Sequence, residues 1–273
     1  MRDDFGVLIC SHCRAETMTT HDVLRRQGYT GKIIVVIDDE DEQREEYENR
    51  YECVEVFCKE SEYQKADGVI FGKKDSALYA RNASYDIAKK YGLVYFAEID
   101  DDMTGFYFRY IEGLTAKSSK ANLDKLFDAM ICFMDSGEIS ALSLMVQSDY
   151  IGGINGRAFQ KGLLRAITGG FVILKTERRI SFLSCMNEDY ATSFVCGQKG
   201  GLLLRVDAGM VLSQKLRCNT GGDELLYKEM NLFSRAFVLC IVRPDCMKVD
   251  SKNEARVKWD VAVPMIMSER WRK

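Results

Sequence analysis

The first hundred residues alternate between short, largely apolar segments and longer segments whose apolar side chains recur at helical spacing. The apolar segments are FGVLIC at 5–10, KIIVVI at 32–37, VEVF at 54–57 and LVYFAEI at 93–99, and the helical ones are 17–27, 42–49 and 76–91. Buried strands that alternate with helices form a parallel sheet that is covered on both faces. We therefore expect an α/β fold with a mostly parallel central sheet flanked by helices.

The second half of the chain is less regular but continues this pattern. Its expected helices are 122–135 and a helix that opens at Asn187 and ends near Gly197, and its expected strands are 142–146, 170–176 and 201–206. No Pro-rich linker, internal repeat or low-complexity segment separates the halves. We expect one continuous domain with two halves, residues 1–112 and 113–273.

Composition limits the class of protein. The chain has 273 residues, 47% hydrophobic and 29% charged, which is typical of a globular protein with an ample core. No stretch approaches the roughly 18 apolar residues of a membrane span, and the N-terminus lacks the features of a signal peptide. The 10 cysteines are accompanied by only 2 histidines, which favours reduced thiols over a zinc site. We therefore expect a cytoplasmic protein.

Charge is distributed unevenly along the chain. Residues 38–62 hold twelve acidic and three basic side chains, whereas residues 157–217 hold ten basic and four acidic ones. Such asymmetry either indicates a polyanionic partner for the second half or reflects solvated faces of opposite sign.

Polar residues follow the expected strands at the points where each strand ends. In open α/β sheets a ligand binds outside the carboxyl ends of the strands. This rule places four segments around one crevice: Ser11–Arg14, Asp38-Asp39, Arg81-Asn82 and the triplet Asp100–Asp102.

The triplet raises an electrostatic question. Alternate residues of a strand point to the same side, so Asp100 and Asp102 are expected to converge while Asp101 faces away. Two carboxylates at one site repel each other unless a cation intervenes. A hard ion, Mn²⁺ or Mg²⁺, removes that repulsion and bridges carboxylate to phosphate oxygens. The alternative is a strand that ends in solvent. Arg81 favours the first interpretation, because its guanidinium suits a phosphate.

The whole pattern resembles a known group of enzymes. ALYARNASYDIAKKYGLVYFAEIDDDM at 77–103 resembles the core of GT-A-fold glycosyltransferases, in which an Arg-Asn pair precedes a D-x-D motif. VIDDE at 36–40 and MNEDYATSFVCGQKGGLLLRVD at 186–207 extend the resemblance, which covers about residues 5–207. Within that fold the chain looks most like the TET-associated glycosyltransferases of phages, which modify pyrimidines in DNA.

The resemblance implies a role for each half and for particular residues. The first half would bind a UDP-sugar, and the second half would bind the acceptor in the host cytoplasm. Asp189 or Glu188 would be the general base if the reaction inverts the anomeric carbon. The alternative is that both acids only stabilise the positive N-terminal end of a helix. Metal ligands would be Asp100 and Asp102, with either Asp223 or only water and phosphate in place of a C-terminal histidine. Donor contacts would come from Ser11, Cys13, Arg14, Asp38, Asp39, Arg81, Asp100 and Asp101.

The implied acceptor is a 5-hydroxymethyl or hydroxy pyrimidine in phage DNA. Phosphates of DNA are neutralised by Lys and Arg beside the cleft. The candidates are Arg157, Lys161, Arg165, Lys175, Arg178 and Arg179, with Arg270, Trp271, Arg272 and Lys273 in the tail.

Three other interpretations stay open at this point. The chain is also consistent with a glycosyltransferase that acts on protein, glycan or lipid. A sugar nucleotidyltransferase is less favoured, because that class carries a G-x-G-x-R loop where this chain has Ser-His-Cys-Arg at 11–14. The third is a binding module that keeps the fold without catalysis.

Overall fold

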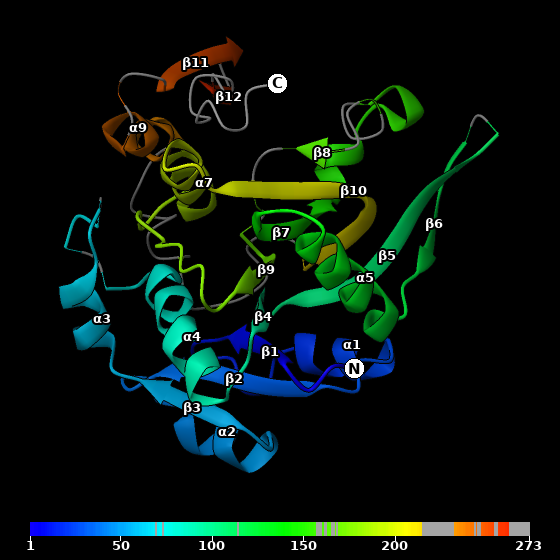
Figure 1. Cartoon of the computed structure of the whole chain (residues 1–273). Helices are drawn as coiled ribbons and strands as arrows, with labels where there is room; N and C mark the ends of the chain where they lie inside the picture. The colour runs from blue at the N-terminus through cyan, green and yellow to red at the C-terminus, as the bar shows by residue number, and fades with distance from the viewer. Residues whose placement is uncertain are drawn as a thin grey trace.

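The computed structural model of the chain describes residues 1–68, 70–72, 74–113, 115–156, 160, 163–164, 167, 169–214, 232–242, 244, 247–253 and 256–261. Among these residues ten strands form one sheet in the order β3-β2-β1-β4-β9-β7-β10-β5-β6, with β8 paired to β10, and helices lie on both faces (Figure 1). The strands are β1 (Phe5–Cys10), β2 (Lys32–Asp38), β3 (Val54–Phe57), β4 (Tyr95–Asp100), β5 (Met103–Glu112), β6 (Thr115–Lys120), β7 (Ile139–Val146), β8 (Leu163–Leu164), β9 (Phe171–Lys175) and β10 (Leu202–Ser213).

The helices match the expected ones closely and add further elements. They are α1 (Thr20–Arg26), α2 (Arg44–Arg50), α3 (Lys59–Lys65), α4 (Leu78–Lys90), α5 (Leu123–Asp135), α7 (Glu188–Gln198) and α9 (Leu232–Val242), with 3₁₀ turns η1 (Gln147–Tyr150) and η2 (Gly153–Asn155). A separate two-stranded sheet pairs β11 (Met247–Asn253) with β12 (Arg256–Val261). Of the helices described, none is long and apolar enough to cross a membrane.

Successive side chains of the first strands face two different cores, because the strand period is two. Val7 and Ile9 face one core together with residues of α1 and α5. Leu8, between them, faces the other core together with residues of α4. Both faces of β1 are therefore buried, which explains why this segment is apolar throughout.

The sheet changes character along its length. The pairs β1–β2, β1–β4 and β2–β3 are parallel, and β7–β10 is parallel as well. The pairs β4–β9, β7–β9, β5–β10 and β5–β6 are antiparallel. The predicted α/β fold is confirmed, and the expected mostly parallel sheet is in fact mixed, because β9 enters it against the direction of β4.

The two predicted halves meet in a hairpin. β5 ends at Glu112, which lies opposite Thr115 of β6, so residue 112 falls at the hairpin turn. β5 also pairs with β10. Strands from before and after residue 112 thus contribute to one continuous sheet, and the hairpin projects from its edge (Figure 1).

An aromatic cluster fixes α5 on the sheet. Phe127 of α5 lies with its ring centroid 5.6 Å from those of Phe5 and Tyr29, 6.0 Å from that of Phe106 and 5.7 Å from that of Phe171. These rings come from β1, β5, β9 and the turn before β2. One side chain of α5 therefore contacts rings from three strands that are spread across the main sheet.

We expect Phe127→Ala to lower the free energy of unfolding by about 3–5 kcal/mol, because it removes a fully buried ring and leaves a cavity. Phe133→Ala on the same helix is the matched control, since Phe133 is 39% exposed, and it should change stability by less than about 1 kcal/mol. Urea unfolding followed by circular dichroism measures both. Equal losses in the two variants would contradict this assignment of the core.

Candidate functional site

Three strands of the first half end at one edge of the sheet. Cys10, the last residue of β1, lies in register with Val36 of β2 and with Asp100, the last residue of β4. The loop that follows β1 therefore begins beside the ends of both neighbours. The structure brings together the Ser11–Arg14 loop, Asp38 and the acid triplet, as the strand rule predicts.

Asp101 ties this loop to the triplet. Its carboxylate accepts a hydrogen bond of 2.6 Å from Ser11 Oγ and an ion-paired one of 2.8 Å from Arg14 Nη1. Its carbonyl accepts the N–H groups of Thr19 and Thr20 at the start of α1. Burial raises the pKa of Asp101, and Arg14 opposes that rise. With only 2% of its surface exposed, Asp101 organises the site from inside.

Arg81 links the triplet to a distant part of the chain. Its Nη2 lies 2.8 Å from Asp100 Oδ1, and its Nε lies 3.5 Å from Glu188 Oε1. The guanidinium also lies over the ring of Phe182, 5.7 Å from its centroid. Arg81 therefore joins the acid that ends β4 to the acid that begins α7.

Of the three aspartates in the triplet, Asp102 has the most strongly raised pKa. Burial raises its pKa to about 7, and the charges of Asp100 and Asp101 add to the effect, whereas Arg14 opposes it. The Asp100 side chain is 37% exposed, so part of this carboxylate faces solvent. Two neighbouring carboxylates, one of them with a pKa raised by burial and then by repulsion, form a donor set that suits a hard divalent cation.

The start of α7 lies at the same edge. Asn187, just before the helix, has φ of 53°, a left-handed conformation that is uncommon outside glycine. Asp189 Oδ1 accepts the N–H of Tyr190, and burial raises the pKa of the Asp189 carboxyl. Glu188 and Asp189 thus combine a helix start with a position beside Arg81.

Two glycines between the acid clusters escaped the sequence analysis. A Cβ on Gly170 would lie 3.3 Å from Asp100 Oδ2, and a Cβ on Gly169 would lie 3.2 Å from Glu188 Oε1. Gly170 also accepts the backbone N–H of Asp100. The glycine pair lets the backbone pass close to both carboxylates, and its place directly before a buried strand was the signal that could have identified it.

A second charged group surrounds Asp38, the last residue of β2. His12 Nδ1 lies 2.7 Å from Asp38 Oδ2, and Lys59 Nζ lies 3.1 Å from Asp38 Oδ1. Burial disfavours the ionised form of Asp38, but His12 and Lys59 outweigh it and lower the pKa of its carboxyl. The hydrogen bond to Asp38 in turn raises the pKa of His12. Asp39 is exposed and accepts the backbone N–H of Lys59.

Cys13 and Asp41 complete this group. The backbone N–H of Cys13, which has φ of 54°, donates to Asp41 at 2.8 Å. His12, Cys13 and Asp41 are the one trio of metal-ligand side chains within 4.8 Å of one another in the described part of the chain. Of the three predicted metal ligands, Asp100 and Asp102 lie in the described triplet, and Asp223 lies outside the described residues.

The three predicted basic residues that the structure describes, Lys175, Arg178 and Arg179, do not gather at this edge. β9 runs antiparallel to β4, so Lys175 lies opposite Tyr95, at the far end of β4 from Asp100. The expectation that Lys175 lies beside the cleft is therefore wrong. Arg178 is exposed in the turn that follows β9, and Arg179 pairs with Asp86 at 3.0 Å. Outside the described residues lie Arg157, Lys161, Arg165, Arg270, Trp271, Arg272 and Lys273.

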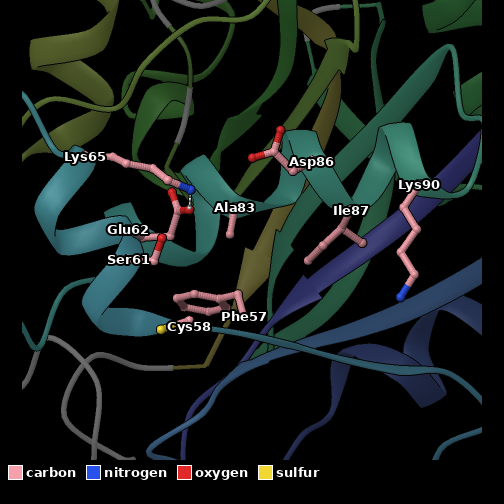
Figure 2. Close-up of a pocket in the computed structure, with 9 residues that line it drawn as sticks. All are labelled: Phe57, Cys58, Ser61, Glu62, Lys65, Ala83, Asp86, Ile87 and Lys90. Atoms are coloured by element: carbon pink, nitrogen blue, oxygen red, sulfur yellow. Dashed lines mark hydrogen bonds and ion pairs between the residues drawn. The ribbon is translucent and has the colours of Figure 1, made fainter.

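A shallow groove of about 290 Å³ between α3 and α4 lies apart from the acid edge (Figure 2). It contains none of the predicted site residues and is lined by Phe57, Cys58, Ser61, Glu62, Lys65, Ala83, Asp86, Ile87 and Lys90. Glu62 pairs with Lys65 across its wall at 2.7 Å. The charges of the groove are thus largely satisfied within the protein.

The raised pKa of Asp102 predicts a stability effect with a definite sign. Its folded-state value of about 7 exceeds the ordinary 3.8, so the folded protein binds this proton more tightly and loses stability as pH rises from about 4 to about 7. We expect Asp102→Asn to stabilise the metal-free protein, by a margin that grows by about 1–2 kcal/mol between pH 5 and pH 7.5 after allowance for solvent screening.

Chemical denaturation at the two pH values measures this margin. Asp128→Asn on α5 is the control, because Asp128 is exposed, and its effect should not vary with pH. A constant or shrinking margin for Asp102→Asn would show that the triplet is not under electrostatic strain.

Comparison with known proteins places the chain. No curated protein is matched by its sequence. A similar solved structure is the crystal structure of GalNAc-T7 with UDP, GalNAc and Mn²⁺, with a TM-score of 0.48 and 14% identity over 78% of this chain. The present chain spans 44% of the length of that one. The sequence profile of the TET-associated glycosyltransferases matches residues 5–222. This match covers most of the chain, which belongs to the family of TET-associated glycosyltransferases.

Proposed function

We propose that the protein transfers a sugar from a UDP-sugar to a hydroxyl group on its acceptor, with the help of Mn²⁺ or Mg²⁺. One observation carries the proposal: Arg81 contacts both Asp100 and Glu188. In this proposal Asp100, at the end of β4, and Glu188, at the start of α7, are parts of one site. Glycosyl transfer needs this arrangement, because the donor diphosphate and the acceptor hydroxyl must meet at one carbon atom.

The donor side of the proposed site is the acid triplet with the loop after β1. Asp100 and Asp102 would hold the cation, which when bound supplies Lewis-acid stabilisation of the diphosphate leaving group. Arg14, whose side chain is 19% exposed, would add positive charge from the loop. Asp38 and Asp39 would face the nucleoside, as the family resemblance implies.

The acceptor side is the start of α7. A general base works best when its pKa lies near the operating pH. Burial raises the pKa of the Asp189 carboxyl, which moves it toward neutral pH. Glu188 is engaged with Arg81. We therefore assign the base to Asp189 for a reaction that inverts the anomeric carbon, and we assign the orientation of Arg81 to Glu188.

The proposed acceptor is a hydroxymethylated pyrimidine in DNA, and the family assignment supports this class. The C5 substituent of a pyrimidine lies in the major groove, and enzymes that modify a base reach it there or after the base is flipped out. The basic excess of residues 157–217 is compatible with a polyanion.

We expect Asp100→Ala and Asp102→Ala each to reduce manganese-dependent UDP binding at least about tenfold, because each removes a charged ligand of the cation. Isothermal titration calorimetry with and without Mn²⁺ measures the effect. Asp22→Ala, on the exposed face of α1, is the control and should bind UDP as the wild type does. Wild-type affinity in both triplet variants would refute the metal site.

The acceptor is tested by its product. Incubation with a panel of UDP-sugars, Mn²⁺ and DNA that contains 5-hydroxymethylcytosine should add one hexose or pentose mass to the modified nucleoside and release UDP. Mass spectrometry of digested DNA measures the transfer, and unmodified DNA is the matched control. Release of pyrophosphate would indicate nucleotidyl transfer, and transfer only to proteins, glycans or lipids would exclude DNA as the acceptor.

A further inference from the structure

Glu98 is a buried carboxyl group that the proposed reaction leaves unexplained. It lies in the middle of β4, its exposed fraction is 0%, and neither of its oxygens has a hydrogen-bond partner among the described residues. Its neighbours in the sheet are apolar: Leu8 of β1 and Val172 of β9. A valine or leucine would suit this position far better, because burying an unpaired polar group is costly.

Glu98 shares a face of β4 with Asp100, the acid that pairs with Arg81. Glu98 and Asp100 are two residues apart on β4 and point to the same side of the sheet, where Asp100 contacts Arg81. The charges of Glu98 and Arg81 act on each other, and both act on Cys10 of the adjacent strand. Glu98 therefore lies on the same face of the sheet as the Arg81–Asp100 pair, one residue pair further from the end of β4.

Arg81 has matching unsatisfied groups. The whole side chain is 2% exposed, and its Nε and Nη1 have no hydrogen-bond partner among the described residues. Nε has the 3.5 Å ion pair with Glu188, so Nη1 is the donor left over. It occurs on the same face of the sheet as the two unpaired oxygens of Glu98. Buried polar groups are nearly always paired in folded proteins, so this coincidence points to a second arrangement of the same side chains.

Binding of a donor supplies a reason for that second arrangement. Asp100 is shared between Arg81 and the cation in the proposed function, on which this inference rests. When Asp100 turns toward the donor, Arg81 needs another acceptor to stay between the two acid clusters. We propose that Glu98 is a positioning residue whose carboxyl group accepts the N–H groups of Arg81 Nη1 and holds the guanidinium in place while Asp100 binds the donor.

Two variants separate this role from a merely structural one. Glu98→Gln keeps the size and one acceptor oxygen, whereas Glu98→Leu keeps the approximate volume and removes every acceptor. Replacement of a poorly paired buried carboxyl by an apolar group is commonly neutral or stabilising. A positioning role therefore predicts that Glu98→Leu melts at or above the wild-type temperature and yet functions poorly.

The functional readouts are UDP affinity in the presence of Mn²⁺ and the donor KM. We expect Glu98→Leu to weaken UDP binding and raise the donor KM roughly 10- to 100-fold, the usual range for residues that orient a metal site, and Glu98→Gln to restore both to within about threefold. Glu62→Leu is the matched control, because Glu62 is 7% exposed in the groove between α3 and α4, and it should leave both values unchanged.

A readout without donor or metal keeps the inference separate from the proposed function. In the Asp100→Ala background Arg81 has lost its present acceptor without any donor being bound. There the guanidinium N–H resonances of Arg81, assigned by their loss in Arg81→Lys, should shift in Glu98→Gln and exchange faster with solvent in Glu98→Leu. Wild-type donor affinity in Glu98→Leu, equal losses in Leu and Gln variants, or an unchanged Arg81 resonance in both would each overturn the positioning role. Absence of UDP binding by the wild type would overturn the proposed function instead, and the resonance would still decide the Glu98–Arg81 contact.

Discussion

Repulsion among three consecutive carboxylates at the end of a buried strand shapes this site. Each carboxylate meets a different environment: Asp100 has Arg81, Asp101 has Ser11 and Arg14, and Asp102 remains close to neutrality. The partners come from α4 and from the loop after β1, so neutralisation of the triplet also fixes those segments in space. Neutralisation of the triplet thereby holds α4 and the loop after β1 beside the end of β4.

The site also concentrates conformational and polar costs. Asn187, directly before Glu188, and Cys13, directly before Arg14, adopt left-handed backbone conformations, and Glu98 is buried without a hydrogen-bond partner among the described residues. The rest of the fold is regular in comparison, with apolar strands buried on two faces and a continuous ring cluster under α5. Such local costs persist where they serve binding or catalysis, because the surrounding core is stable enough to hold them.

The spacing of apolar residues predicted where most helices and strands lie. The sequence did not reveal in which direction each strand runs in the sheet. The strands before Asp100 and the helix α5 carry unambiguous apolar spacing, so their limits were predicted to within a few residues. A short apolar run does not reveal whether its strand is parallel or antiparallel, and the reversed direction of β9 moved Lys175 to the wrong end of the site. The β5–β6 hairpin was missed because most of its side chains are exposed and lack a clear alternation. Gly169 and Gly170 bear no chemistry of their own and matter only through closeness to Asp100 and Glu188.

The paired charges also bear on which ligand the crevice accepts. Arg81 with Asp100, Arg14 with Asp101, and His12 and Lys59 with Asp38 leave little uncompensated charge in the free protein. A bare diphosphate would bring negative charge to carboxylates and gain only from two arginines that already have partners. A diphosphate together with a divalent cation is close to neutral, so it exchanges internal ion pairs for equivalent external ones without leaving a buried charge alone. The electrostatics of the crevice therefore favour the cation and the diphosphate as a unit over either one separately.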